Sequence, residues 1–191
     1  MLYSWPKIDQ RYFLFGGAVS KMALTKTIAE QIKKYDFGEK CSITLTKQSV
    51  RIVDDEKEKS IELPLKRWAS FLTCLPEIED SLNKLRKAEF VKYKEHIGGG
   101  WFVSVTTGFP CVDVRRFYMP MIGFEEKATK SGLAIRLREW HNFVAVVHAM
   151  KKENPQLAEI QPCGLHHNQE EAMRCAECYP FPSATFGSTT I

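Results

Sequence analysis

Residues 60–72, SIELPLKRWASFL, and residues 132–144, GLAIRLREWHNFV, share one pattern. Each stretch begins with alternating apolar residues, which is typical of a half-buried strand, and continues with apolar residues at helical spacing. Trp68 of the first stretch corresponds to Trp140 of the second, 72 residues further on, and a phenylalanine follows each tryptophan by three residues. The match predicts an internal duplication in which strands lead into a helix and both tryptophans pack in the core.

The rest of the chain divides into segments that fit this unit twice. An amphipathic helix is expected at 20–35, and the glycines at 98–100 form a flexible break between the units. The first unit is predicted to have strands at 41–46, 49–53 and 60–63, then helices at 64–75 and 77–96. The second is predicted to have strands at 101–106, 111–118 and 132–137, then a helix that ends by residue 154.

One such unit buries its apolar faces poorly, so the two are expected to pack together as an intramolecular pseudo-dimer. The predicted class is α+β, with two tandem units of antiparallel sheet plus helix. The expected domains are residues 1–97 (the N-terminal helix and a degenerate first unit), 98–155 (the second unit) and 156–191 (a tail with cysteine and histidine).

The composition of the chain favours an intracellular protein with a packed core. Of its 191 residues 44% are hydrophobic and 26% charged, and the net charge is only +4, so an anionic partner must be bound by local clusters of cations. Asp9 and Arg11 interrupt the N-terminus, so no signal peptide is expected, and no apolar run is long enough to span a membrane. Six cysteines then indicate a reducing compartment.

The segment VDVRRFY, residues 112–118, ends a predicted strand with two cations and two aromatic rings. Sequence-tolerant binding of single strands needs cations for the phosphates and ring faces for unpaired bases. Strand alternation places Arg115 and Phe117 on one face, and Arg116 and Tyr118 on the other. The alternative is an edge strand whose aromatic residues fold into the core.

Three stretches of the second unit follow one another in a recognisable order: FVSV (102–105), VDVRRFY (112–118) and KATKSGLAI (127–135) before Trp140. In this order they resemble the positive cofactor four family of single-stranded-DNA-binding transcriptional coactivators. The resemblance implies curved antiparallel sheets of four strands with a C-terminal helix, arranged as a dimer across which single strands run. The duplicated chain would supply both halves, with Arg115 and Tyr118 as DNA contacts.

The resemblance also singles out the hairpin at 106–110 and the segment that begins at Lys127. In the family this hairpin usually carries an aromatic residue and lysines; here it is shorter, keeps Phe109 and has no lysine. Lys127 and Lys130 are candidate phosphate contacts, with a solvated loop as the alternative. In the first unit the residues after Val53 are acidic, so it is expected to be mainly a structural partner.

Two further cations, Arg136 and Arg138, lie on the polar face of the last predicted strand of the second unit. They are candidates to extend the basic surface toward a nucleic acid.

The tail contains two short metal-ligand spacings, Cys163-x-x-His166 and Cys175-x-x-Cys178. Zinc prefers four nitrogen or sulfur ligands in a tetrahedron, and two such turns can supply them. His167 is an alternative to His166. This prediction rests on spacing alone, because the family named above has no such element; the other interpretation is a disordered tail with free thiols.

Together these patterns predict a non-enzymatic nuclear protein that binds single-stranded or melted DNA in transcription or replication. No catalytic motif is recognised. The second hypothesis is a protein-interaction adaptor, with transcription machinery as a possible partner, in which the zinc-binding tail and the charged helix bind proteins and the sheet has lost its DNA role.

Overall fold

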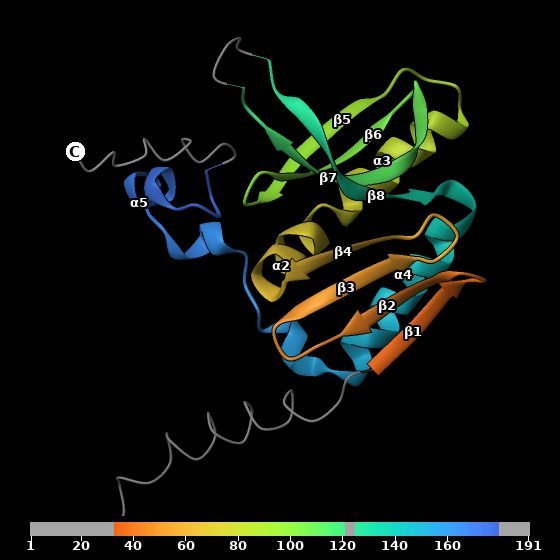
Figure 1. Cartoon of the computed structure of the whole chain (residues 1–191), viewed down its shortest axis with the longest axis horizontal. Coiled ribbons are helices and arrows are strands. Elements are labelled where there is room, and N and C mark those ends of the chain that lie inside the picture. The colour runs from red at the N-terminus through yellow and green to blue at the C-terminus, as the bar shows by residue number, and fades with distance from the viewer. Residues whose placement is uncertain (1–32, 121–124, 180–191) are drawn as a thin grey trace, which may run out of the picture.

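The computed structural model describes residues 33–120 and 125–179, which form two four-stranded antiparallel sheets with helices (Figure 1). In each sheet the strands lie in the order in which they occur in the chain. The first sheet contains β1 (Lys33–Gly38), β2 (Cys41–Leu45), β3 (Ser49–Asp54) and β4 (Lys59–Pro64). The second contains β5 (Lys92–Gly98), β6 (Trp101–Thr106), β7 (Phe109–Tyr118) and β8 (Lys127–Arg136).

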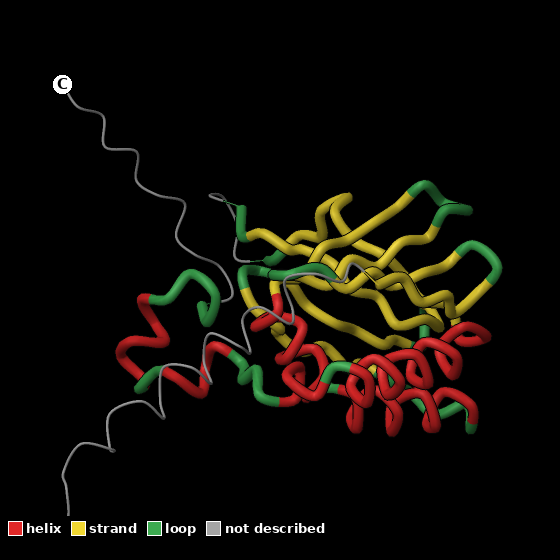
Figure 2. Tube along the Cα trace, turned by 90° about the horizontal axis from the view of Figure 1, so that it is seen from below, coloured by secondary structure: helices red, strands yellow, loops and turns green. Residues whose placement is uncertain are grey.

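The helices lie on one side of the two sheets and leave the other side open (Figure 2). They are α2 (Leu65–Thr73) and α3 (Leu75–Arg86) after the first sheet, and α4 (Leu137–Glu153) after the second. A tail of short helices follows: η1 (Pro155–Ala158), η2 (Cys163–His166) and α5 (Gln169–Arg174). Within the described residues, no helix combines the length and apolarity needed to cross a bilayer.

The two sheet-plus-helix units share one hydrophobic core, as the repeated pattern predicts. Helix α4 contacts β1 and helix α2 contacts β5, so each unit's helix reaches the other unit's sheet. Phe143 of α4 makes edge-to-face contacts with Phe71 (ring centroids 6.0 Å apart) and Phe37 (5.2 Å). Trp68 and Trp140 are buried, so their predicted core role is confirmed. The pseudo-dimeric relation between the units stays a prediction.

The helix predicted at 77–96 is wrong in its second half. Helix α3 ends at Arg86, Ala88 adopts a left-handed φ of 58°, and Lys92–Gly98 forms strand β5. The many charged residues of this segment suggested a helix, but the segment pairs with β6 as a strand and Ile97 is buried in the core. Pro76, which separates the two helices predicted at 64–75 and 77–96, lies in the first turn of α3, where a missing N–H costs nothing.

Two other local predictions also change. The helix expected at 20–35 lies largely outside the described residues, and its last part, Lys33 to Tyr35, is strand. The glycines at 98–100 form a tight β5–β6 turn with φ values of 124°, 57° and 74°, which only glycine adopts readily. The second sheet therefore begins at Lys92, before the domain boundary expected at residue 98.

Candidate nucleic-acid interface and metal centre

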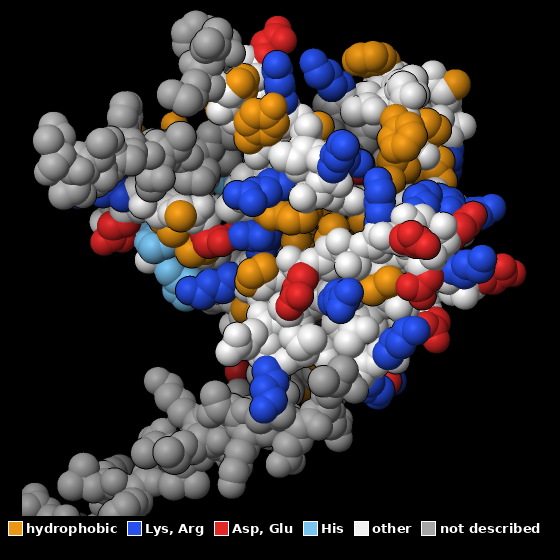
Figure 3. Space-filling model, in the orientation of Figure 1, with side chains coloured by type: hydrophobic (Ala, Val, Ile, Leu, Met, Phe, Trp, Pro, Cys, Tyr) orange, Lys and Arg blue, Asp and Glu red, His pale blue; other side chains and the backbone are white. Residues whose placement is uncertain are grey.

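Strands β3 and β7 occupy equivalent places in their sheets, so their ends can be compared directly. Ile52 of β3 pairs with Ile61, and Val114 of β7 pairs with Leu133, its counterpart in the repeat. Two residues further on, β3 ends in an acidic turn and β7 continues into Arg116, Phe117 and Tyr118. In Figure 3, acidic side chains gather near the β3–β4 turn, at the right of the view.

Arg115, one of the two residues expected to contact DNA, is anchored within the protein. Its Nε lies 2.9 Å from Asp113 Oδ2 and its Nη2 3.0 Å from Oδ1, and its Nη1 donates to the Thr129 carbonyl at 2.9 Å. The Asp113 carboxylate raises the pKa of Arg115 above its ordinary value. A Cβ atom at Gly132, the cross-strand neighbour, would lie 2.9 Å from the Arg115 side chain. The charge of Arg115 is therefore largely satisfied by the sheet itself.

Arg116, Tyr118 and Lys127, which we call the strand-end cluster, lie at the end of the second sheet. All three are exposed; Tyr118 pairs with Lys127 in register, and Arg116 pairs with Trp101. Arg116 and Tyr118 share a face because they alternate with Phe117. Within the part of the chain that the structure describes, no hydrogen bond or ion pair involves these three side chains. The strand-end cluster thus combines two unneutralised cations with a ring that is 48% exposed.

Phe117 lies on the opposite, outer face of the second sheet, where it joins a packed aromatic group. Its ring meets that of Phe102 edge-on, with centroids 5.3 Å apart. The Lys94 ammonium lies 3.5 Å from the Phe117 centroid and forms an ion pair with Glu126. Phe117 is half-buried in this group, so it supports the strand end more than it offers a free ring face.

The remaining predicted cations divide into exposed and internally paired residues. Lys130 is exposed beside the strand-end cluster, in a segment of β8 with two more residues than the matching step of β7. Arg138 is exposed in the first turn of α4, with its Nε 3.8 Å from Glu139 Oε1. Arg136 instead forms ion pairs with Glu56 of the β3–β4 turn (2.6 Å) and with Glu139 (3.0 Å). Arg136 therefore links the two units and is not part of the strand-end cluster.

The two most exposed rings among the described residues lie at the other end of the second sheet. Phe109 is 60% exposed and Phe90 81% exposed. Thr107 fixes the backbone beside both, because its amide donates to the Val91 carbonyl (3.0 Å) and its hydroxyl accepts from the Val91 amide (2.7 Å). Sequence reasoning missed Phe90 because it assigned this segment to a helix; the isolated aromatic residue before Val91 was the available signal.

The tail brings four metal-ligand side chains together. One ligand atom from each of Cys163, His167, Cys175 and Cys178 lies within 4.8 Å of the other three. Cys163 Sγ is 3.4 Å from His167 Nε2 and 3.8 Å from Cys175 Sγ. The cluster can hold a metal ion with three sulfur ligands and one nitrogen ligand. We call residues 163–178, which contain all four ligands, the Cys/His module.

The expected ligand His166 is replaced in this cluster by His167. Helix η2 ends at His166, which points its side chain to solvent, whereas His167 has extended backbone (φ −121°) and a half-buried side chain. A capping box of Asn168 and Glu171 starts α5 directly afterwards and fixes this change of direction. Two backbone N–H groups, from Cys178 and Glu177, stabilise the thiolate of Cys175 and lower its pKa to about 7. Such a thiolate is ready to bind a cation.

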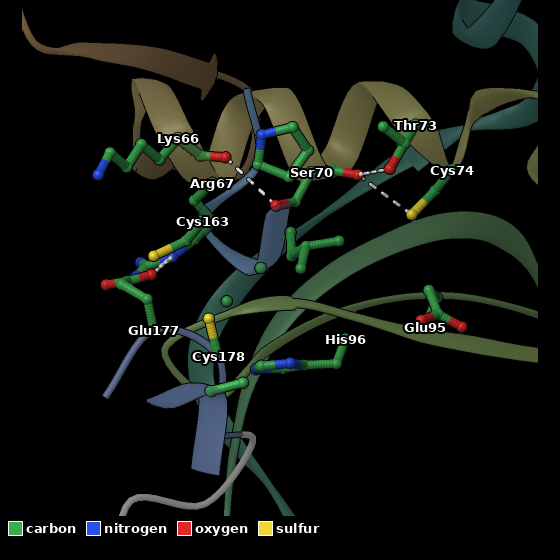
Figure 4. Close-up of a pocket in the computed structure, with 15 residues that line it drawn as sticks. Lys66, Arg67, Ser70, Thr73, Cys74, Glu95, His96, Cys163, Glu177 and Cys178 are labelled. Carbon is green, nitrogen blue, oxygen red and sulfur yellow. Dashed lines mark hydrogen bonds and ion pairs between the residues drawn. The ribbon is translucent and has the colours of Figure 1, made fainter. Parts of the chain in front are cut away.

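A cavity of about 380 Å³ separates the Cys/His module from the body of the protein (Figure 4). Ser70 of α2 and Cys74, which follows α2, line one side, His96 of β5 another, and Cys163 and Cys178 a third. Burial lowers the pKa of His96. The module therefore lies against α2 and β5.

Comparisons with protein-family models, with curated proteins and with solved structures find no match to this chain.

Proposed function

We propose that this protein binds single-stranded or melted DNA through the strand-end cluster, in the service of transcription or replication. The observation that carries the proposal is the contrast at one structural position. Where the first unit ends β3 in Asp54, Asp55 and Glu56, the second ends β7 in two exposed side chains, Arg116 and Tyr118, around a supported phenylalanine.

The chemistry of the strand-end cluster suits a single strand better than a duplex. Arg116 and Lys127 can follow phosphates, and the exposed Tyr118 ring offers a stacking face that only an unpaired base can use. Lys130 adds a third exposed cation nearby. The family resemblance favours Arg115 as a DNA contact. In the proposed site Arg115 has a supporting role instead, because it holds β7 to β8.

We further propose that the ion held by the Cys/His module is zinc. Three thiolates and one imidazole are a common structural zinc set, and four protein ligands leave no open position for a substrate. The role of the ion would accordingly be to hold the module together. Metal analysis of purified protein should find about one equivalent of zinc.

The test of DNA binding compares two arginines and one ring. Tyr118→Ala should weaken binding of an oligo-dT strand by about 1–3 kcal/mol, because one base loses its stacking partner. Arg116→Ala should reduce the slope of log K against log salt by about 0.7. Arg51→Ala is the matched control, since Arg51 is an exposed arginine of the first sheet. Wild-type protein that retains no oligo-dT at low salt would contradict the proposal.

A protein-interaction adaptor is the second candidate, because the Cys/His module itself exposes large apolar side chains. Leu165 is 71% and Met173 68% exposed. Exposed apolar side chains of this size are typical of protein contacts when they form one patch. If the wild type shows no salt-dependent binding of single strands, this adaptor role becomes the leading hypothesis.

A further inference from the structure

The Cys/His module contacts the body of the protein through Glu177, which lies between two metal ligands, Cys175 and Cys178. The Glu177 carboxylate accepts two bonds from Arg67 of α2, at 3.2 Å from Nε and 2.6 Å from Nη2 (Figure 4). The Arg67 side chain is only 11% exposed. A bidentate pair with a nearly buried arginine fixes both the position and the orientation of the module.

The same residue bonds to the β5–β6 turn. The Gly99 amide donates to the Glu177 carbonyl at 2.9 Å. A Cβ atom at Gly98 would lie 2.8 Å from Glu177 Oε2, and one at Gly99 would collide with the Arg67 guanidinium. The turn therefore has glycines where the backbone must approach Glu177 and Arg67 closely.

The β5–β6 turn also holds the end of β7. The Gly100 carbonyl accepts from the Phe117 amide at 2.8 Å. Trp101, the next residue, pairs with Arg116, and the Arg67 guanidinium lies 6.0 Å from its ring. Glu177, the glycine turn and Phe117 thus form one continuous hydrogen-bonded path from the metal ligands to the strand-end cluster.

The Cys/His module needs its ion to keep this contact. Neither η2 nor α5 has a buried residue, so these elements have no apolar core of their own. In such small modules the free energy of metal binding is the free energy of folding. Without the ion, the segment that carries Glu177 keeps only its bonds to Arg67 and Gly99 to hold it in place; if these open, the nearly buried arginine loses its counter-charge.

We propose that Arg67 and Glu177 are positioning residues through which metal binding by the Cys/His module fixes the end of β7 and the strand-end cluster. The coupling is direct: it passes through two backbone hydrogen bonds of one turn. The part that concerns DNA rests on the function proposed above, whereas the part that concerns the turn does not.

The first experiment measures amide hydrogen exchange in the full chain, loaded with zinc and after removal of the metal by a chelator. The Gly99 and Phe117 amides should exchange about tenfold faster without metal, which corresponds to the loss of one hydrogen bond. The Thr46 amide, which closes the β2–β3 hairpin of the first sheet, is the internal control and should not change. Equal exchange at Gly99 and Phe117 in both states would overturn the proposal.

Two variants separate positioning from metal binding. Glu177→Gln leaves all four ligands in place, so it should keep one equivalent of zinc and still exchange faster at Gly99 and Phe117. The exchanged pair Arg67→Glu with Glu177→Arg should recover part of the protection that either single variant loses. Loss of zinc from Glu177→Gln would make Glu177 part of the metal site and refute its positioning role, as would a failure of the exchanged pair to recover any protection.

Oligo-dT affinity provides the second readout. Metal removal and Glu177→Gln should each weaken binding by about three- to tenfold, about as much as one lost hydrogen bond. If zinc-loaded wild type binds no oligo-dT, the proposed function fails while the exchange result still decides the coupling. If exchange responds to metal but oligo-dT affinity does not, the link from the turn to DNA binding is wrong.

Discussion

The ends of β3 and β7 occupy equivalent positions in the two sheets, yet their side chains differ in charge and exposure. At the end of β3, Asp54 is 2% exposed, accepts from the Lys57 amide and lies 3.1 Å from the Lys57 ammonium. At the end of β7, Arg116 is exposed and Tyr118 half-exposed. Asp54 is thus paired within the protein, whereas the Arg116 side chain makes no hydrogen bond or ion pair with the described residues.

The two hairpins that precede these ends differ in the same way. Ser49 closes the β2–β3 hairpin and bonds to Thr46 and Glu62, so its polar atoms are satisfied inside the sheet. Phe109 closes the β6–β7 hairpin and exposes most of its ring. In this pair of hairpins, the residue of the first unit is bonded inside the sheet and the residue of the second unit exposes its ring.

The largest effect on stability should follow from removal of the buried Asp54 carboxylate. Asp54→Ala should lower the free energy of unfolding by about 1–3 kcal/mol, because Lys57 loses its counter-ion and its capping acceptor. Urea unfolding measures this. Arg116→Ala, at the equivalent position, should stay within about 0.5 kcal/mol of wild type. Equal losses in the two variants would remove the distinction between the strand ends.

Arg115 and Arg116 sharpen the comparison within a single strand. Arg115→Ala should cost about 1–2 kcal/mol of stability, since it leaves a half-buried Asp113 without its partner. Arg116→Ala should leave stability unchanged and reduce the salt dependence of oligo-dT binding. Urea unfolding and a salt titration of both variants check the pair. The reverse pattern would show that Arg115 is the residue free to bind.

A smaller effect is expected at the far end of the second sheet. Phe109→Ser, which copies the closing residue of the first hairpin, should weaken binding of a long oligo-dT strand by about 1 kcal/mol. Phe109 and Tyr118 lie nine positions apart along β7, a distance of about 30 Å. A short oligonucleotide that cannot span this distance should bind the variant and the wild type equally. Fluorescence titrations with the two lengths make the comparison.

The smallest effect should be that of Phe90→Ala on stability. The ring is almost fully exposed, so the free energy of unfolding should change by less than about 0.5 kcal/mol. A larger loss in urea unfolding would mean that Phe90 packs against a partner in solution.

The repeat pattern predicted the two sheet-plus-helix units because its repeated apolar residues are the ones that are buried in the core. Trp68 and Trp140 follow strands at the same spacing, and core packing enforces that spacing in both units. Strand β5 was missed because its exposed edge carries Lys92, Lys94 and Glu95, residue types that also suit a helix surface. Pairing with β6, a contact between separate strands, decides its conformation.

The sequence was enough to predict which segments carry the candidate sites, but not which residue of each segment is exposed or lies in the metal cluster. Alternation correctly separated Arg115 from Arg116, but the choice between them depends on Asp113 and Thr129, and on a register shift in β8 that local sequence does not reveal. For the Cys/His module, spacing identified three cysteines; the choice of His167 over His166 depends on where a single turn of helix ends.

Arg67 and Glu177 are 110 residues apart in the chain. This separation determines when their ion pair can form during synthesis. Arg67 leaves the ribosome well before its partner exists, while domains fold as their segments emerge. Both sheets can therefore pair while the β5–β6 turn still lacks its last acceptor. The contact between Glu177 and the β5–β6 turn forms only after residue 177 has been made, so a product cut short before the Cys/His module would have both sheets and an unbraced strand end.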